Sequence, residues 1–165
     1  MPEANLLGEI DRGFYGLLGS LNYERIVVGS GALGMARAAM DDSIAYANER
    51  QAFGRPIGEF QAIQHYVAEM AMRIEQASLL LRYAAWLQDT DQPAGMRATM
   101  AKVAASETAV YCADRGIQIL GGYGYTMEYP LQRYWRDARL TMIGPITSEV
   151  ARNYIARQVG MHRSR

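Results

Sequence analysis

The sequence predicts an all-α fold, an up-down four-helix bundle with additional short C-terminal helices. Over three long stretches apolar residues recur at spacings of three, four and seven, a pattern typical of amphipathic helices. Clusters of glycine and proline separate these stretches. No stretch alternates apolar and polar residues as a half-buried β-strand does. Several helices joined by short connections are expected to pack as a bundle.

The first twenty residues differ in composition from the rest of the chain. They contain four glycines and one proline and have no sustained periodicity, so we interpret residues 1–20 as a linker or the tail of a preceding domain. The first helix is predicted over residues 21–51. Asn22 is a suitable N-cap, and Glu24 falls in the first turn, where the helix dipole favours an acid. Pro56 and its flanking glycines end the pattern, and residues 21–162 are expected to form the bundle.

The remaining helices follow from their apolar stripes and end signals. A second helix is predicted from about residue 60 to 88, and a third from 95 to 120, where Gly121 and Gly122 end it. Pro130 suits the first position of a short helix that extends to about residue 142. Thr147 or Ser148 can cap a last helix, which extends to about residue 159.

Composition excludes several classes of function. The 17 basic and 17 acidic residues cancel and are interspersed, which argues against a nucleic-acid-binding face. Cys112 is the only cysteine, so no internal disulfide can form, and a reducing compartment is expected. Because there is no apolar run of about 18 residues and no signal-peptide pattern, we expect a soluble, cytoplasmic protein without a membrane span. Lys102 is the only lysine, which we attribute to arginine-rich codon usage, and His65 and His162 are too few for a metal site.

One motif suggests a dinucleotide-binding fold but lacks its context. Residues 29–34 match the pattern G-x-G-x-x-G, which in that fold lies between a strand and a helix of a βαβ unit. No second strand follows, since residues 50–58 form a loop. We therefore expect these glycines to allow close packing of the first helix against a neighbour.

Two glycine-containing loops carry the strongest functional signal. Residues 50–64 combine Arg50 with aromatic residues, glycines and glutamines, and residues 118–125 place Gly121 and Gly122 after a helix. An arginine holds a phosphate with paired hydrogen bonds, and glycines let backbone N–H groups approach its oxygens. The loops suit a phosphorylated ligand with a flat ring. Taken alone, Phe53 would be a core residue, and the alternative role of the two glycines is only to end the helix.

The chain resembles the carboxy-terminal domain of the acyl-CoA dehydrogenases in several segments that follow the same order. These segments are residues 5–9, 21–25, the two loops, 134–138 and 143–150. The resemblance implies a FAD-dependent enzyme that carries out α,β-dehydrogenation of acyl-CoA thioesters. It also implies a missing amino-terminal helical domain and middle β-domain, a homodimer or homotetramer formed through the bundle, and electron-transfer flavoprotein or a similar electron acceptor. We expect the chain to be inactive in isolation.

The same resemblance implies which residues contact the cofactor. Arg50 would hold the pyrophosphate, and Phe53 would lie against the flavin or on its adenine side. Residues 147–149 would touch the adenosine part, although capping of the last helix explains them equally well. The full set of expected FAD-binding residues is Arg50, Phe53, Gln61, Gln118, Gly121, Gly122, Thr147, Ser148 and Glu149. Gln64 is a weaker candidate.

The catalytic base does not stand where most of the family has it. In the matching segment, residues 143–148, Pro145 occupies the position of the usual glutamate and cannot accept a proton. A minority of the family, including the isovaleryl-CoA and long-chain types, has the base on the first bundle helix, just before an arginine. That position is Glu24, and its neighbours Asn22 and Arg25 would contact the substrate. Two alternatives stay open: a non-catalytic FAD-binding assembly subunit, or an oxygen-using flavoenzyme of the same fold.

Overall fold

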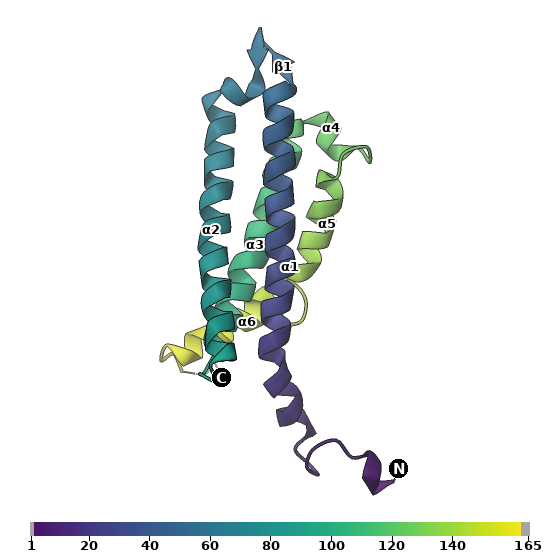
Figure 1. The fold of residues 1–165 in the computed structure, drawn as a ribbon, viewed down its shortest axis with the longest axis vertical. Helices are drawn as coiled ribbons and strands as arrows, with labels where there is room; N and C mark the ends of the chain where they lie inside the picture. Colours follow the sequence, from purple (N-terminus) through teal and green to yellow (C-terminus); the bar gives the residue numbers. More distant parts are fainter. Residues whose placement is uncertain (1, 163–165) are drawn as a thin grey trace.

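The computed structural model describes residues 2–162, and they form an elongated bundle of α-helices (Figure 1). This confirms the predicted all-α class. Two 3-10 helices, η1 (Glu3–Asn5) and η2 (Ile57–Glu59), and two very short strands, β1 (Gln51–Ala52) and β2 (Arg55–Pro56), accompany the α-helices. In chain order these are α1 (Gly13–Glu49), α2 (Gln61–Asp89), α3 (Gly95–Leu120), α4 (Gly122–Tyr125), α5 (Leu131–Thr141) and α6 (Ser148–Gln158).

Helix α1 begins at Gly13, eight residues before the start predicted from its apolar pattern. Adding residues to an existing helix costs far less than nucleating one, so a glycine-rich stretch can continue a helix that its own composition would not start. Its first turns project beyond the other helices (Figure 1), with Phe14 and Leu17 68% and 59% exposed. Asn22 consequently lies inside the helix, and its predicted role as an N-cap was wrong. Met1 lies outside the described residues.

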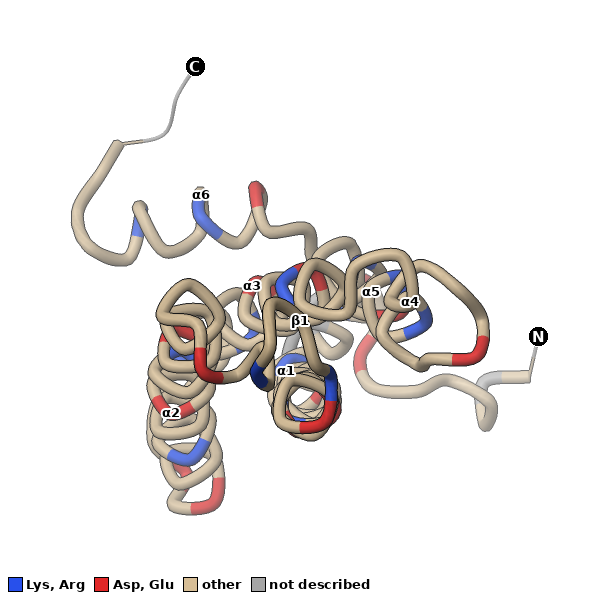
Figure 2. Tube along the Cα trace, turned by 90° about the horizontal axis from the view of Figure 1, so that it is seen from above, with Lys and Arg blue, Asp and Glu red and all other residues tan. Residues whose placement is uncertain are grey.

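The core forms where α3 packs against α1, α2 and α5 (Figure 2). Small side chains dominate this contact and let the helix axes approach closely. Gly29 of α1 shows how tight the fit is, because a Cβ placed there would lie 2.8 Å from Leu81 Cδ2 of α2. Fully buried alanines recur on the facing sides of the two central helices: Ala32, Ala36 and Ala39 on α1, and Ala98, Ala101, Ala105 and Ala109 on α3.

The glycine motif of residues 29–34 lies entirely within α1, so a βαβ unit is excluded there. Close packing explains Gly29, as expected, but it does not explain the other two glycines. Gly31 and Gly34 are exposed, and a Cβ at either position would meet no atom within 4 Å. For these two the packing interpretation was wrong.

A hairpin between α1 and α2 was not predicted from the sequence. Strands β1 and β2 pair in antiparallel fashion, and the two residues between them, Phe53 and Gly54, have φ angles of 52° and 80°. Positive φ at both central residues is the signature of a type I′ turn. Strands of two residues are too short to show alternation. Phe53 at the tip is 94% exposed, so its assignment to the core from the sequence alone was wrong.

The end of α1 and the ends of α2, α3, α5 and α6 agree with the prediction to within one or two residues, and both ends of α3 agree fully. Helix α4 was not predicted, since the sequence was interpreted as a loop there. Of the two caps predicted for α6, Thr147 is the one that forms, since its Oγ1 accepts a hydrogen bond from Val150 N at 3.3 Å. Helix α6 crosses one end of the bundle (Figures 1 and 2), where Arg152 Nη2 and Glu107 Oε1 of α3 form an ion pair of 2.6 Å.

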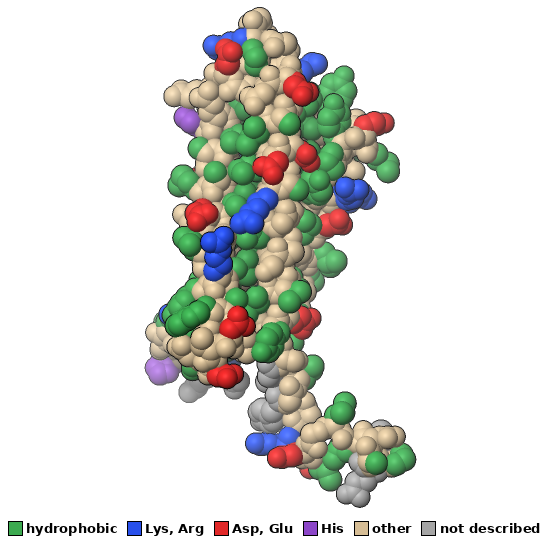
Figure 3. Space-filling model, in the orientation of Figure 1, with side chains coloured by type: hydrophobic (Ala, Val, Ile, Leu, Met, Phe, Trp, Pro, Cys, Tyr) green, Lys and Arg blue, Asp and Glu red, His purple; other side chains and the backbone are tan. Residues whose placement is uncertain are grey.

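Acidic, basic and hydrophobic side chains are intermixed on the face shown in Figure 3, without a patch of one sign. Between residues 2 and 162, none of the helices combines the length and the apolar character needed to cross a membrane.

Candidate functional site

The structure separates the predicted site residues into two groups at opposite ends of the bundle (Figure 1). We call the end that carries the hairpin and α4 the hairpin end, and the end that carries α6 the α6 end. Glu24 and Arg50 are joined by α1, and 26 residues at 1.5 Å each separate them by about 39 Å. The hairpin end carries Arg50, Phe53, Gln61, Gln118, Gly121 and Gly122. The α6 end carries Asn22, Glu24, Arg25, Thr147, Ser148 and Glu149.

A cavity of about 460 Å³ opens at the hairpin end between the last turn of α1 and the α3–α4 junction. Arg50, Gly121 and Gly122 line it, together with Tyr46 and Tyr123. Gly121 has φ 61° and ψ −135°, a conformation that glycine adopts readily and other residues avoid. A Cβ built at Gly121 or Gly122 would meet no atom within 4 Å, so a ligand can approach this backbone closely.

The backbone of Arg50 is fixed on both sides. Its N–H donates to Tyr46 O at 2.9 Å, and its carbonyl accepts from Ile57 N at 2.8 Å. The side chain is exposed, with its guanidinium carbon 5.9 Å from the centre of the Tyr123 ring. The structure thus brings the cation of Arg50 to the same cavity as an open glycine backbone, which is an arrangement suited to a phosphate.

The other candidates at the hairpin end lie near this cavity without lining it. Gln61 begins α2 and Gln118 lies in the last turn of α3, and both are exposed. Phe53 packs edge-to-face on Phe60, with ring centres 6.0 Å apart. Gln64 is engaged within the chain, because its Nε2 donates to Gly58 O at 3.1 Å.

At the α6 end, Arg25 is almost fully buried, at 9% exposed. Its Nη1 donates to Asn22 Oδ1 at 3.0 Å, and its guanidinium carbon lies 5.9 Å from the centre of the Tyr154 ring of α6. Burial lowers the pKa of Arg25, while Tyr154 and the carboxylate of Glu24 oppose that shift. Arg25 Nε has no hydrogen-bond partner within residues 2–162. Sequence reasoning missed Tyr154, since nothing in the pattern of the last helix points to α1.

Glu24 is exposed on α1 beside this buried arginine. Within the described part of the chain, its carboxylate makes no hydrogen bond and no ion pair. An exposed carboxylate without a partner is accessible to a molecule that lies outside the bundle, and a general base has to come within hydrogen-bond reach of the proton that it removes.

Residues 143–148 are anchored to the bundle by Lys102, whose side chain is completely buried in α3. Lys102 Nζ donates to Ile146 O at 2.6 Å. Burial lowers the pKa of Lys102, and Glu107 and Glu149 partly oppose that shift. The sequence signal was present, since the only lysine of the chain stands in an alanine-rich helix, but composition alone assigned it no structural role.

Ser148 and Glu149, the first two residues of α6, differ in their exposure. Ser148 is 1% exposed, its N–H donates to Met142 O at 3.1 Å, and its Oγ has no partner among the described residues. Glu149 is exposed. Hydrogen bonds from its own backbone N–H and from Thr147, with Arg152 and Arg139 nearby, lower the pKa of Glu149 and keep it charged.

Cys112 and the histidines form no second site. Cys112 is buried in α3, and burial raises its thiol pKa to about 12, so the nucleophilic thiolate is suppressed. Across residues 2–162, no group of three or more His, Cys, Asp or Glu side chains is arranged to hold a metal ion.

Residues 11–160 match the family described as acyl-CoA dehydrogenase, C-terminal domain, and the chain belongs to that family. Benzylmalonyl-CoA dehydrogenase of Aromatoleum aromaticum is 50% identical over 82% of this chain and 36% of that protein.

Two solved structures have nearly the same fold. Butyryl-CoA dehydrogenase from Megasphaera elsdenii superposes with a TM-score of 0.94 at 38% identity, over 96% of this chain and 42% of that one. The prolyl acyl carrier protein oxidase AnaB superposes with a TM-score of 0.94 at 34% identity, over 98% of this chain and 42% of that one. The chain thus spans about two fifths of the length of the relatives it matches.

Proposed function

We propose that this chain is the helical-bundle part of a FAD-dependent enzyme that introduces an α,β double bond into acyl-CoA thioesters. One observation carries the proposal. In a chain of this family, Arg50 lies beside the open backbone of Gly121 and Gly122 at one end of α1, and the unpartnered carboxylate of Glu24 lies towards the other end. FAD, when bound, would accept the hydride that leaves the β-carbon.

The hairpin end fits the phosphate-containing part of FAD. Arg50 supplies a planar cation that can bind two phosphate oxygens, and Gly121 and Gly122 leave their backbone open beside it. Phe53, Gln61 and Gln118 would add contacts at the rim, where all three are exposed. In the complete flavoenzyme, R50A should weaken FAD binding by 10-fold or more, roughly the value of one charge-assisted hydrogen bond. Unchanged affinity would refute this assignment.

The two ends of one chain cannot serve the same flavin, because about 39 Å of helix separates Glu24 from Arg50. We therefore propose that the segment 147–149 contacts the adenosine side of one FAD through Thr147 and Glu149, and that Arg50 reaches the FAD of a second copy. Ser148 is 1% exposed and would act by positioning these two neighbours. A homodimer or homotetramer with shared sites follows from this arrangement.

Complementation tests this sharing directly. If E24Q and R50A chains are combined in one oligomer, at an FAD concentration too low to fill the sites that lack Arg50, half of the sites in each mixed pair regain both residues. An equal mixture should then recover about one quarter of the wild-type activity. No recovery from mixtures that are shown to contain both chains would contradict the shared site.

Glu24 is proposed as the base that removes the α-proton of the substrate. Asn22 and Arg25 adjoin it; the buried Arg25 is held by Asn22 and lies against Tyr154, and we assign both residues to orienting the thioester. E24Q should retain FAD and lower turnover by about 10²- to 10⁴-fold, the usual contribution of a general base. D41N, another exposed acid of α1, is the matched control. Full turnover by E24Q would refute Glu24 as the base, and the absence of acyl-CoA-dependent bleaching of the bound flavin would favour the non-catalytic assembly subunit.

The identity of the electron acceptor distinguishes a dehydrogenase from an oxygen-using enzyme of the same fold. Electron-transfer flavoprotein or a similar carrier is the proposed acceptor, and the cytoplasm is the proposed location. The likeness to AnaB, named as an oxidase that acts on a carrier-protein substrate, supports an oxygen-using enzyme as the second candidate. Hydrogen peroxide formed in step with substrate would favour the oxidase, whereas turnover that needs an added carrier would favour the dehydrogenase.

A further inference from the structure

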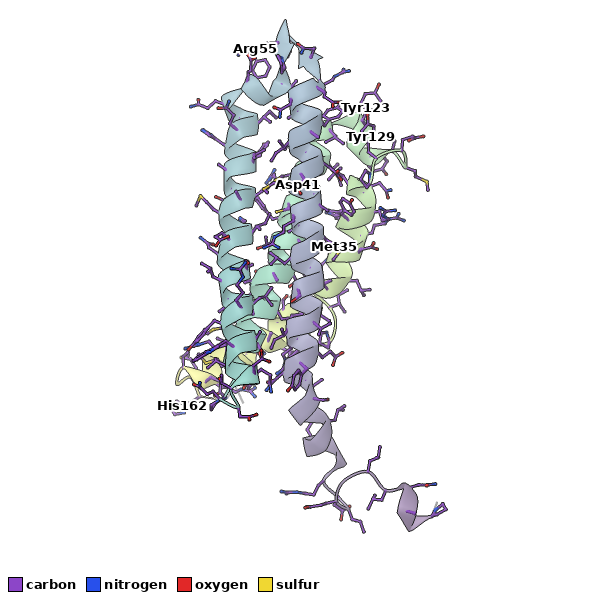
Figure 4. The ribbon with its side chains drawn as sticks, in the orientation of Figure 1. Met35, Asp41, Arg55, Tyr123, Tyr129 and His162 are labelled. Atoms are coloured by element: carbon purple, nitrogen blue, oxygen red, sulfur yellow. The ribbon has the colours of Figure 1, made fainter. Side chains whose placement is uncertain are left out.

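Three tyrosine rings form a cluster beside Arg50 at the hairpin end. Tyr46 comes from α1, Tyr123 from α4, and Tyr129 from the turn before α5; Figure 4 shows Tyr123 and Tyr129 close together at this end. Each ring contacts the other two. The centres are 5.8 Å apart for Tyr46 and Tyr129, 5.8 Å for Tyr123 and Tyr129, and 6.4 Å for Tyr46 and Tyr123. These tilted and edge-on geometries are the favourable ones for aromatic pairs.

The guanidinium of Arg50 lies over one ring of this cluster, 5.9 Å from the centre of Tyr123. Within about 6 Å the negative face of an aromatic ring attracts a cation. Arg50 makes no ion pair within residues 2–162, and its backbone is already held on both sides. The Tyr123 ring is therefore the contact that can restrain the long side chain.

Tyr123 itself is well fixed. Its carbonyl accepts hydrogen bonds from Thr126 N at 3.2 Å and from Thr126 Oγ1 at 3.0 Å. The next residue, Gly124, lies so close to α3 that a Cβ there would be 2.8 Å from the Cα and O of Ile117. The ring thus stands on a rigid support, with Tyr46 and Tyr129 packed against its sides.

We propose that Tyr123, supported by Tyr46 and Tyr129, is a positioning residue that holds the Arg50 guanidinium over the cavity for a diphosphate ligand. The inference rests on the proposed role of Arg50 in binding FAD. Without the ring, Arg50 samples many rotamers, and the binding step has to order it. Ordering one long side chain weakens binding by about 2- to 13-fold.

The test compares Y123L, which removes the aromatic face, with Y123F, which keeps it. Y83L is the control, because Tyr83 of α2 is 45% exposed and its ring stacks on Trp86, outside both loops and outside the cluster. In the complete flavoenzyme, Y123L should raise the FAD dissociation constant by about 2- to 13-fold, and Y123F and Y83L should leave it near the wild-type value. Equal losses for Y123F and Y123L would overturn the proposal.

A double-mutant cycle separates positioning from general damage. If Tyr123 acts through Arg50, Y123L should have no further effect on FAD affinity in the R50A background; an undiminished effect there would overturn the proposal. Side-chain NMR relaxation of the Arg50 Nε–H group in the 165-residue chain should show greater mobility in Y123L than in Y123F, and equal mobility would overturn it as well. If R50A leaves FAD affinity unchanged, the proposed FAD role fails, and this NMR comparison still decides whether Tyr123 restrains Arg50.

Discussion

Replacing the buried Lys102 with methionine is predicted to loosen residues 143–148 and to destabilise the bundle. Methionine keeps most of the apolar stem and removes the ammonium, so the main loss is the 2.6 Å hydrogen bond to Ile146 O. A hydrogen bond from a charged donor contributes about 1.5–3 kcal/mol. Because methionine carries no charge, the variant also avoids the free-energy cost of burying an ammonium, which offsets part of this loss. The expected net cost is about 1–2 kcal/mol.

Urea and thermal unfolding of wild type and K102M measure that cost. For a chain of this size, 1–2 kcal/mol corresponds to a fall in Tm of about 2–8 °C. Amide hydrogen exchange should be faster in K102M than in wild type at residues 143–148. The increase should be smaller in the middle of α3, because the anchor is local. A K102M variant as stable as wild type would refute the reasoning, since it would mean that the desolvation of the ammonium cancels its bond.

The same pair of proteins has a predicted pH dependence. Burial lowers the pKa of Lys102 in the folded chain below the 10.5 of an unperturbed lysine. Between these two pKa values the unfolded chain binds a proton that the folded chain does not, so the free energy of unfolding rises with pH in that window. The stability of wild type relative to K102M should therefore increase as the pH rises towards 10.5. Other titrating groups are common to both proteins, and a constant difference would contradict a desolvated ammonium.

Two further predictions concern packing and reactivity. G116A should destabilise the bundle by about 1–3 kcal/mol, because its Cβ would lie 2.5 Å from Leu131 Cδ1 and 2.9 Å from Ser43 Oγ. G34A, in an open part of α1, should instead stabilise by about 0.5–1 kcal/mol in urea unfolding, and equal effects of the two changes would disprove the packing argument. Cys112, with its thiol pKa raised to about 12, should react with thiol reagents at pH 8 only after unfolding. Rapid labelling of the folded chain would contradict its burial.

Local patterns were sufficient for most of the fold. Both ends of α3 could be predicted because an apolar stripe meets a glycine stop at Gly121, and Thr147 could be predicted as a cap from its position alone. The start of α1 could not, because helix extension is cooperative and overrides the weak propensity of glycine. The hairpin around Phe53 escaped detection because its strands have two residues each.

The candidate site, too, has features that the local sequence predicts and features that depend on the tertiary structure. Arg50, Gly121 and Gly122 belong to segments whose composition already suits a phosphate, and the structure brings all three to one cavity. The contact between Lys102 and Ile146 joins positions 44 residues apart, and no periodicity reveals such a pair. Glu24 could be proposed from the family resemblance and Pro145, whereas its buried neighbourhood could be seen only after folding.

Helix α1 also limits how the gene for this protein can change in length. Each inserted or deleted residue between Glu24 and Arg50 would turn one end of the helix against the other by about 100° and shift it by about 1.5 Å. A single insertion would thus point one of the two side chains away from its ligand. Seven inserted residues would nearly restore the direction but move the two ends about 10 Å further apart. Insertions and deletions should therefore be far rarer in this stretch than in the exposed hairpin that follows it.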